Sequence, residues 1–113
     1  MTEYSRGDVI LVNFVFSDEA GARRRPAAIV SSDAYHQGRQ EVIIAAITSR
    51  TDRILTGDHL IKDWEGAGLL FPSVLTGIIR TIKQGMIAGK LGIMLKTDME
   101  AVDSNLRLAL ALS

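Results

Sequence analysis

The stretch RRRPAAIVSSDAYHQGRQEVIIAAIT, residues 23–48, decides the fold that the sequence predicts. It holds two apolar runs, 27–30 and 42–47, on either side of a polar loop. Short apolar runs with β-branched residues, bounded by polar segments, are typical of neighbouring strands. Arginines precede the first run and hydroxyl side chains follow the second. An arginine brought close to a hydroxyl in this way can bind a phosphate.

Further strands are expected on both sides of this stretch. The run VILVNFVF, residues 9–16, is apolar on both faces, so we expect the core on one side and a further layer or a second subunit on the other. Pro26 cannot donate to a ladder and belongs at the start of a strand or on an edge. After Gly85, a short helical turn and a small strand both fit the sequence. The remaining strands are predicted at 27–32, 41–48, 58–61, 69–75 and 77–83.

The chain ends in the clearest helix. Residues 97–100, TDME, have the form of a capping box, in which Thr97 begins the helix and Glu100 reaches back to its amide. Apolar residues then recur at three- and four-residue spacing, as on a helix that packs one face on a sheet. The predicted fold class is therefore mainly β (α+β): a small antiparallel barrel or half-barrel with a C-terminal helix, in a single domain spanning residues 1–113. The apolar face consists of Met99, Val102, Leu106, Ala109 and Leu110.

Composition excludes several classes of protein. The 113 residues contain no cysteine, which excludes disulfides and cysteine-ligated metals and is compatible with a cytoplasmic protein. The polar first residues are no signal peptide, and no apolar run approaches the roughly 20 residues that a membrane helix needs. The 13 basic and 13 acidic residues give zero formal net charge, so a generally basic nucleic-acid binder is not expected. The segment 23–53 is nevertheless locally basic, and a polyanionic partner would have to bind there.

Five segments, taken in order, resemble the MazF/PemK family of toxin ribonucleases. The similarity covers nearly the whole chain, and the ordered set carries it rather than any single motif. The segments are RGDVILVNF (6–14), RRPAAIVSSDAY (24–35), IIAAITS (43–49), SVLTGIIRTI (73–82) and LALAL (108–112).

The resemblance implies an SH3-like or PemK-like barrel, a homodimer, and the toxin component of a type II toxin–antitoxin system. It also implies metal-independent, sequence-specific cleavage of single-stranded RNA without a cofactor, and inhibition by a cognate antitoxin whose disordered tail occupies the RNA groove. The family's active arginine, before the proline, matches Arg25, and its active threonine or serine matches Thr48. The arginine of the family's arginine-threonine strand matches Arg80. Loop 17–22, SDEAGA, departs from the usual family sequence.

The chemistry of RNA cleavage gives these residues their expected roles. The 2′-hydroxyl must lose a proton, the leaving 5′-oxygen must gain one, and negative charge on the phosphorus must be stabilised. Arg25 offers a planar fork of donors for two phosphate oxygens but is a poor general base. Thr48 can orient a hydroxyl or a phosphate oxygen, and the general base stays unassigned. The candidate RNA contacts are Arg23, Arg24, Ser31, Ser49, Arg50, Arg80 and His36.

Several of these residues have a second interpretation. His36 is either an acid–base group beside the basic stretch or a solvated loop histidine. The Thr48 hydroxyl either acts on RNA or is satisfied by the backbone at a strand end. Trp64 and Phe71 either stack on bases or belong to the core or a dimer interface. The alternative function is a non-catalytic nucleic-acid- or gyrase-binding toxin on the same barrel.

Overall fold

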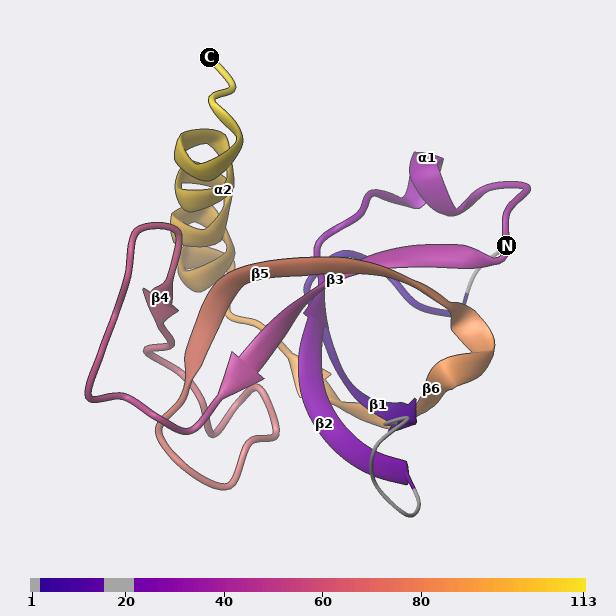
Figure 1. The fold of residues 1–113 in the computed structure, drawn as a ribbon, viewed down its shortest axis with the longest axis horizontal. Coiled ribbons are helices and arrows are strands. Elements are labelled where there is room, and N and C mark those ends of the chain that lie inside the picture. The colour runs from indigo at the N-terminus through magenta and orange to yellow at the C-terminus, as the bar shows by residue number, and fades with distance from the viewer. Residues whose placement is uncertain (1–2, 16–21) are drawn as a thin grey trace.

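One antiparallel sheet of six strands forms the centre of the protein (Figure 1). The computed structural model describes residues 3–15 and 22–113. The strands lie in the order β4-β5-β3-β2-β1-β6, and the sheet curves strongly. Within the described residues the edge strands β4 and β6 do not pair with each other, so the expected barrel is an open half-barrel. The strands are β1 (Asp8–Val15), β2 (Ala22–Ile29), β3 (Glu41–Thr48), β4 (His59–Leu60), β5 (Val74–Lys83) and β6 (Ile87–Ile93).

Three helical segments connect or follow the strands in ranges 3–15 and 22–113. A short helix, α1 (Asp33–His36), lies in the loop between β2 and β3, and the 3-10 turn η1 (Gln84–Met86) joins β5 to β6. The turn and the strand expected after Gly85 are therefore both present. The C-terminal helix is α2 (Lys96–Leu110), which confirms the predicted fold class. No helix in the described part of the chain is long and apolar enough to cross a membrane.

Hydrophobic side chains are buried on both faces of the sheet. The first cluster joins one face to α2 and includes Val9 and Val102, and the second includes Ile10, Val12 and Ile29. Burying a side chain of this size contributes roughly 1.5–3 kcal/mol. Strand β1 supplies both clusters, so the cover expected on its two faces is confirmed. It comes from the same chain and needs no second subunit.

Strand β2 differs from the prediction in its bounds. It spans Ala22–Ile29 rather than 27–32, and Pro26 lies in its middle, paired with Leu11 of β1. The expectation that Pro26 begins a strand or lies on an edge is therefore wrong. The proline is tolerated because its nitrogen, which carries no hydrogen, faces β3 at a point where the ladder between β2 and β3 has ended. Phe16 and most of the predicted loop 17–22 lie outside the described residues.

The two strands predicted at 69–75 and 77–83 are one strand, β5, preceded by a loop. The strand continues through Gly77, where its pairing with β3 is irregular and the Gly77 amide donates to Asp58 Oδ1 at 2.8 Å. Residues 69–73 form no strand, because Pro72 has no amide hydrogen to give to a ladder. This loop becomes one wall of the functional site.

The start of α2 also differs from the prediction. The capping box proposed at Thr97 is wrong, because the N-cap is Leu95 and the helix begins at Lys96. Leu95 makes no side-chain hydrogen bond to the helix amides. The acidic residue of the first turn, Asp98, is used for a different contact.

Asp98 ties the first turn of α2 to the segment after β4. Its side chain is fully buried, and Oδ1 accepts hydrogen bonds from His59 Nε2 at 2.7 Å and from the Lys62 amide at 2.9 Å. Oδ2 accepts from the Asp63 amide at 3.1 Å. Burial by itself raises the pKa of Asp98, but the hydrogen bonds from Lys62, His59 and Asp63 outweigh it and hold the pKa below its usual value.

Candidate functional site

The ladder between β2 and β3 ends at Pro26. Amides of a central antiparallel strand point alternately to its two neighbours, and the Val30 amide donates to Ile43 O of β3 at 2.9 Å. Pro26 lies four residues before Val30, so its nitrogen also faces β3. That nitrogen has no hydrogen to donate. Pairing accordingly stops at Ala27 and Ala46. Beyond this point the two strands separate and leave a gap in the sheet.

The register of the two strands sets Arg25 opposite Thr48 across this gap. Ala28 pairs with Ala45 and Ala27 with Ala46, and two further steps along each strand reach Arg25 and Thr48. Because no ladder joins the strands here, both side chains are free to border an opening. The sequence order of an arginine before Pro26 and a threonine at the end of β3 thus becomes a spatial pair.

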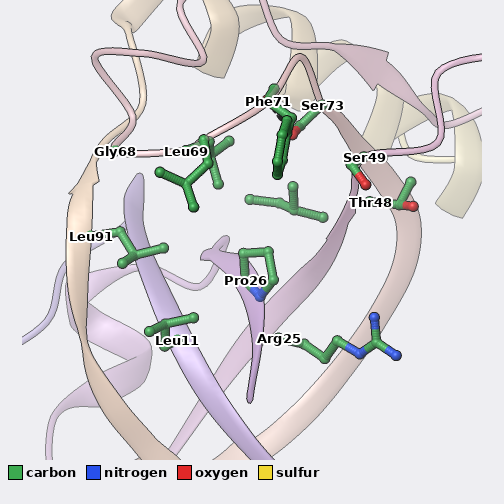
Figure 2. A pocket seen from close by; sticks show the side chains of 12 residues that line it. Leu11, Arg25, Pro26, Thr48, Ser49, Gly68, Leu69, Phe71, Ser73 and Leu91 are labelled. Carbon is green, nitrogen blue, oxygen red and sulfur yellow. Dashed lines mark hydrogen bonds between the residues drawn. The ribbon is translucent and has the colours of Figure 1, made fainter. Parts of the chain in front are cut away.

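An apolar pocket of about 430 Å³ opens beside this pair (Figure 2). Strands β1, β2, β3 and β6 and the loop that precedes β5 supply its apolar walls, and hydroxyl groups and one arginine supply its polar groups. In Figure 2, Arg25, Thr48 and Ser49 lie together on one side of the opening. The lining residues are Leu11, Arg25, Pro26, Ile47, Thr48, Ser49, Gly68, Leu69, Leu70, Phe71, Ser73 and Leu91.

Arg25 is the one ionisable side chain among the described residues that line the pocket. The side chain is exposed, and none of the residues in ranges 3–15 and 22–113 makes a hydrogen bond or ion pair with it. A guanidinium in this state can direct two parallel N–H groups at an anionic ligand.

Thr48 and Ser49 supply hydroxyl groups on the same side. Thr48 Oγ1 accepts a hydrogen bond from the Arg50 amide at 3.1 Å, so the backbone satisfies part of its capacity. Its own proton has no acceptor within the described part of the chain, and the hydroxyl can therefore still donate to a ligand oxygen. The interpretation that the backbone satisfies Thr48 is therefore confirmed for its acceptor, and the action of the hydroxyl on RNA stays a prediction.

Arg50, a predicted RNA contact, is held by a carboxylate. Its Nε lies 3.4 Å from Asp52 Oδ1, and both side chains are largely exposed. The hydrogen bond from Arg50 lowers the pKa of Asp52. The pair lies just beyond Thr48 along the chain, where an arriving phosphate would compete with Asp52 for the guanidinium.

The other three arginines lie outside the pocket. Arg23 and Arg24 are exposed on β2, and Arg24 Nε donates to Asn13 Oδ1 at 3.3 Å. Arg80 is exposed on β5 opposite Ile44, four residues before Thr48 on β3, which is about 13 Å along the strand. The structure therefore does not bring Arg80 to the pocket that holds Arg25 and Thr48.

Ser31 and His36 are buried near the start of β3, away from the pocket. Their side chains are 6% and 1% exposed, and His36 Nε2 lies 2.6 Å from Ser31 Oγ. Ser31 Oγ also accepts a hydrogen bond from the Ile43 amide at 2.9 Å. Together the two side chains anchor α1 to β3. The interpretation of His36 as a solvated loop histidine is wrong because the ring lies inside the protein, and the structure does not bring His36 to the pocket beside Arg25.

The apolar walls of the pocket are the part that the sequence interpretation missed. Loop residues 69–71 were predicted as a strand, and Leu91 and Leu11 carried no functional signal. Trp64 and Phe71, which shared one pair of interpretations, have different surroundings in the structure. Trp64 packs against the first hydrophobic cluster, whereas Phe71 borders the pocket and is 61% exposed. Pro72, directly after two leucines and a phenylalanine, was the available sign that this run is a loop.

Comparisons with known proteins agree with this fold. Residues 5–110 match the family model of the PemK-like, MazF-like toxins of type II toxin–antitoxin systems. No curated protein sequence matches the chain.

Solved structures with the same fold share about a fifth of the sequence. A chain of a MazE–MazF crystal structure from Deinococcus radiodurans has a TM-score of 0.82 at 19% identity, over 100% of both chains. An endoribonuclease in complex with its cognate antitoxin, from a mycobacterial species, has a TM-score of 0.77 at 22% identity, over 97% of both chains. The Mycobacterium tuberculosis toxin MazF-mt6 has a TM-score of 0.72 at 21% identity, over 92% of this chain and 98% of its own.

Proposed function

We propose that this chain, which belongs to the PemK-like, MazF-like toxins of type II toxin–antitoxin systems, is an endoribonuclease that cleaves single-stranded RNA. The observation that carries the proposal is the gap between β2 and β3, which sets Arg25 opposite Thr48 at the side of an open pocket. The guanidinium of Arg25 can bind two phosphate oxygens, and the hydroxyl proton of Thr48 can bind a further oxygen. Such a pair can stabilise the transition state of phosphodiester cleavage. Solved structures of this fold include proteins described as endoribonucleases.

In the proposed reaction the ribose 2′-oxygen loses its proton and attacks the adjacent phosphorus. The bond from phosphorus to the 5′-oxygen breaks, and that oxygen takes up a proton. The products are a 2′,3′-cyclic phosphate and a 5′-hydroxyl end, and DNA is not cut because it lacks the nucleophile. No metal ion or cofactor takes part.

Arg25 binds two phosphate oxygens and stabilises the charge that develops on them. Removing one well-aimed donor of this kind costs roughly 10²–10³ in rate. Thr48 donates its hydroxyl proton to a phosphate oxygen and keeps its orientation through the Arg50 amide. Proton removal from the 2′-hydroxyl is assigned to none of the described lining residues, because Arg25 is the only ionisable group among them. Ser49, Arg50, Arg23 and Arg24 are the candidate contacts for neighbouring phosphates.

The same proposal covers the partners of the protein. The toxin acts in the cytoplasm as a homodimer, and a cognate antitoxin inhibits it. Two of the solved structures with this fold hold a MazE–MazF pair and an endoribonuclease with its cognate antitoxin. An antitoxin segment that covers Arg25 and the pocket would block access of RNA to both.

The test is an RNase assay with purified protein, single-stranded RNA and an excess of chelator. We expect fragments with 5′-hydroxyl ends, and sequencing of these ends gives the cleavage motif. Arg25→Ala should lose about 10²–10³ in rate while its thermal unfolding is unchanged. Arg107→Ala, an exposed arginine on α2, is the matched control. Intact RNA across many sequences would contradict the proposal, and inhibition of gyrase supercoiling in a parallel assay would favour the non-catalytic alternative.

A further inference from the structure

The exposed ring of Phe71 has no structural role that would explain its position. It is 61% exposed, although a buried phenylalanine would stabilise the fold by roughly 1.5–3 kcal/mol. Phe71 borders two hollows: the 430 Å³ pocket, and a shallower one of about 360 Å³ that it shares with Ser49, Thr51 and Pro72. Figure 2 shows the ring projecting from the loop at the mouth of the pocket.

The loop that carries Phe71 is held rigidly against β6. Gly68 has a φ of +79°, and a Cβ atom added there would lie 2.1 Å from Leu91 O. On the opposite strand, a Cβ atom added to Gly92 would lie 2.6 Å from the carbonyl carbon of Ala67. Backbone therefore lies directly on backbone, and side chains at these two positions would push the loop away.

Ser73 fixes the other end of the loop. This serine is 4% exposed, and its Oγ donates to the carbonyl oxygen of Phe71 at 2.8 Å. The Phe71 backbone is thus held at its position before any ligand arrives. With the backbone fixed, only the two side-chain torsions of the aromatic ring have to be restrained on binding, and this small loss of conformational freedom favours affinity.

The pocket beside the ring suits a base better than a phosphate. Its walls are largely leucine, and an unpaired phosphate charge placed against them would lose its hydration without compensation. A nucleobase has apolar faces and a polar edge, and single-stranded nucleic acids are commonly held by stacking bases on aromatic side chains. The hydroxyl of Ser49, on the pocket's polar side, can meet that edge.

We propose that the pocket accepts one base of the RNA next to the bond that is cleaved, and that Phe71 stacks on this base. The inference rests on the proposed function, since it takes RNA as the ligand of the same site. The phosphate next to this base then reaches Arg25 and Thr48, so one nucleotide is held by its base and by its phosphate. The next nucleotide leaves across the hollow between Phe71 and Thr51.

Binding and cleavage are measured separately to test this. Fluorescence anisotropy follows a labelled RNA of about 12 nucleotides that carries 2′-O-methyl groups on every ribose and cannot be cleaved. Its sequence spans the cleavage site found by end sequencing or, where no site is found, a mixed sequence. Phe71→Leu should weaken binding by about 5- to 150-fold, the range for one stacked base. Phe71→Tyr keeps the ring and should bind as the wild type does, and Ile93→Ala removes an equally exposed apolar group outside the pocket.

The decisive experiment combines the protein variant with the RNA. An abasic residue is placed at each position in turn, and one position should weaken binding to the wild type much more than the others. In Phe71→Leu the same abasic residue should have little further effect, because the two changes remove the same contact. Equal RNA affinity of Phe71→Leu and wild type, or an abasic profile that Phe71→Leu leaves unchanged, overturns the proposal, whatever else fills the pocket. A loss of affinity that follows a change in oligomeric mass also overturns it.

Failure of this inference is distinguishable from failure of the proposed function. If unmodified RNA is cleaved and the abasic profile does not depend on Phe71, the proposed endoribonuclease activity is supported and the proposed base pocket is rejected. If RNA binding shows the expected coupling between Phe71 and the abasic position but RNA is never cleaved, the proposed base pocket is supported and the proposed endoribonuclease activity is rejected.

Discussion

The effect of Arg25 is expected to depend on the shape of its side chain as well as on its charge. Arg25→Lys keeps one positive charge but replaces a planar fork by a single ammonium group, which cannot hold two phosphate oxygens in parallel. We expect kcat/KM for RNA to fall by about 10–10²-fold, less than for alanine. Full activity of the lysine variant would mean that charge alone matters at this position.

Thr48 is expected to act through its hydroxyl proton. Thr48→Val keeps the shape of the side chain and removes the hydroxyl, while Thr48→Ser keeps the hydroxyl. A hydrogen bond to a charged group is worth about 1.5–3 kcal/mol, so the valine variant should lose roughly 10- to 150-fold in rate. Single-turnover cleavage of RNA measures the effect. Equal rates for the valine and serine variants would contradict a role for the hydroxyl.

At the residue scale, the sequence predicted the pair on the pocket's polar side but not its surroundings. Arg25 could be found because it stands directly before Pro26, and Thr48 because it ends a continuous apolar strand. His36 could not be assigned correctly, since nothing in a polar loop sequence says that a neighbouring serine will draw the ring into the protein. Arg80 could not be placed because its distance from Thr48 depends on the register between β3 and β5.

At the scale of elements, Pro26 keeps the site open. Pro26→Ala supplies the amide hydrogen that β2 lacks at the point where it separates from β3. We expect the new hydrogen bond, worth about 0.5–1.5 kcal/mol, to draw the two strands together and narrow the pocket. RNA cleavage should then fall, while the free energy of unfolding changes by no more than about 1 kcal/mol.

Hydrogen exchange tests this directly. In the Pro26→Ala variant the new amide at position 26 should be protected from exchange. A rapidly exchanging amide with unchanged RNA cleavage would show that the missing hydrogen bond is not what separates the strands.

Asp98 is expected to make the attachment of α2 dependent on pH. Asp98→Asn replaces one of the two acceptor oxygens by an NH₂ group. The backbone amides of Lys62 and Asp63 both donate to this side chain, so one of them would face a donor instead of an acceptor. We expect the free energy of unfolding to drop by at least about 1.5–3 kcal/mol at neutral pH. Denaturant titrations of both proteins measure it.

The sign of the pH effect follows from the lowered pKa of Asp98. The stabilisation is fully present above the pKa of an unfolded aspartate, about 3.9, and is lost as the pH falls through the lower folded value. The difference between wild type and Asp98→Asn should therefore be constant at neutral pH and shrink below about pH 4. A difference that does not change down to acid unfolding would mean that the carboxylate charge is not the cause.

Strand positions were easier to predict than the loops between them. Residues 41–48 were predicted with the correct bounds because a buried central strand is a continuous apolar run. The loop 69–73 was misread as a strand, since leucines that line a pocket look the same in sequence as leucines in a sheet. Helix α2 was predicted from its apolar spacing. Its first residue was not, because Asp98 is held by contacts from a distant segment.

At the scale of the whole molecule, one group of exposed apolar residues in the described part of the chain lies close in sequence to the contacts of Asp58 and outside the pocket. Asp58 joins three elements there: its Oδ1 accepts from the Gly77 amide of β5 at 2.8 Å, and its carbonyl oxygen accepts from Asn105 Nδ2 of α2 at 3.0 Å. Exposed apolar residues lie within three positions of Asp58, Gly77 and Asn105 in the sequence, and α2, β4 and β5 lie side by side in Figure 1. We call them the α2–β5 surface: Leu55, Ile78 and Leu108, which are 55%, 68% and 66% exposed.

We expect the α2–β5 surface to form the interface of the homodimer. The sequence indicates two apolar segments for a dimer, the first strand and the leucine-rich chain end. Both faces of β1 are covered within one chain, so we expect the surface that includes Leu108 of the chain end, rather than β1, to meet the second subunit. Ile78→Glu places a charge on this surface, and burying that charge unpaired in a dimer would be costly. The variant should therefore sediment with the mass of one chain at micromolar concentrations, while the wild type has the mass of two. Ile93→Glu adds the same charge at a side chain on β6 that is 57% exposed and lies outside the surface, so it should stay dimeric. A monomeric wild type, or equal dissociation by both variants, would contradict this assignment.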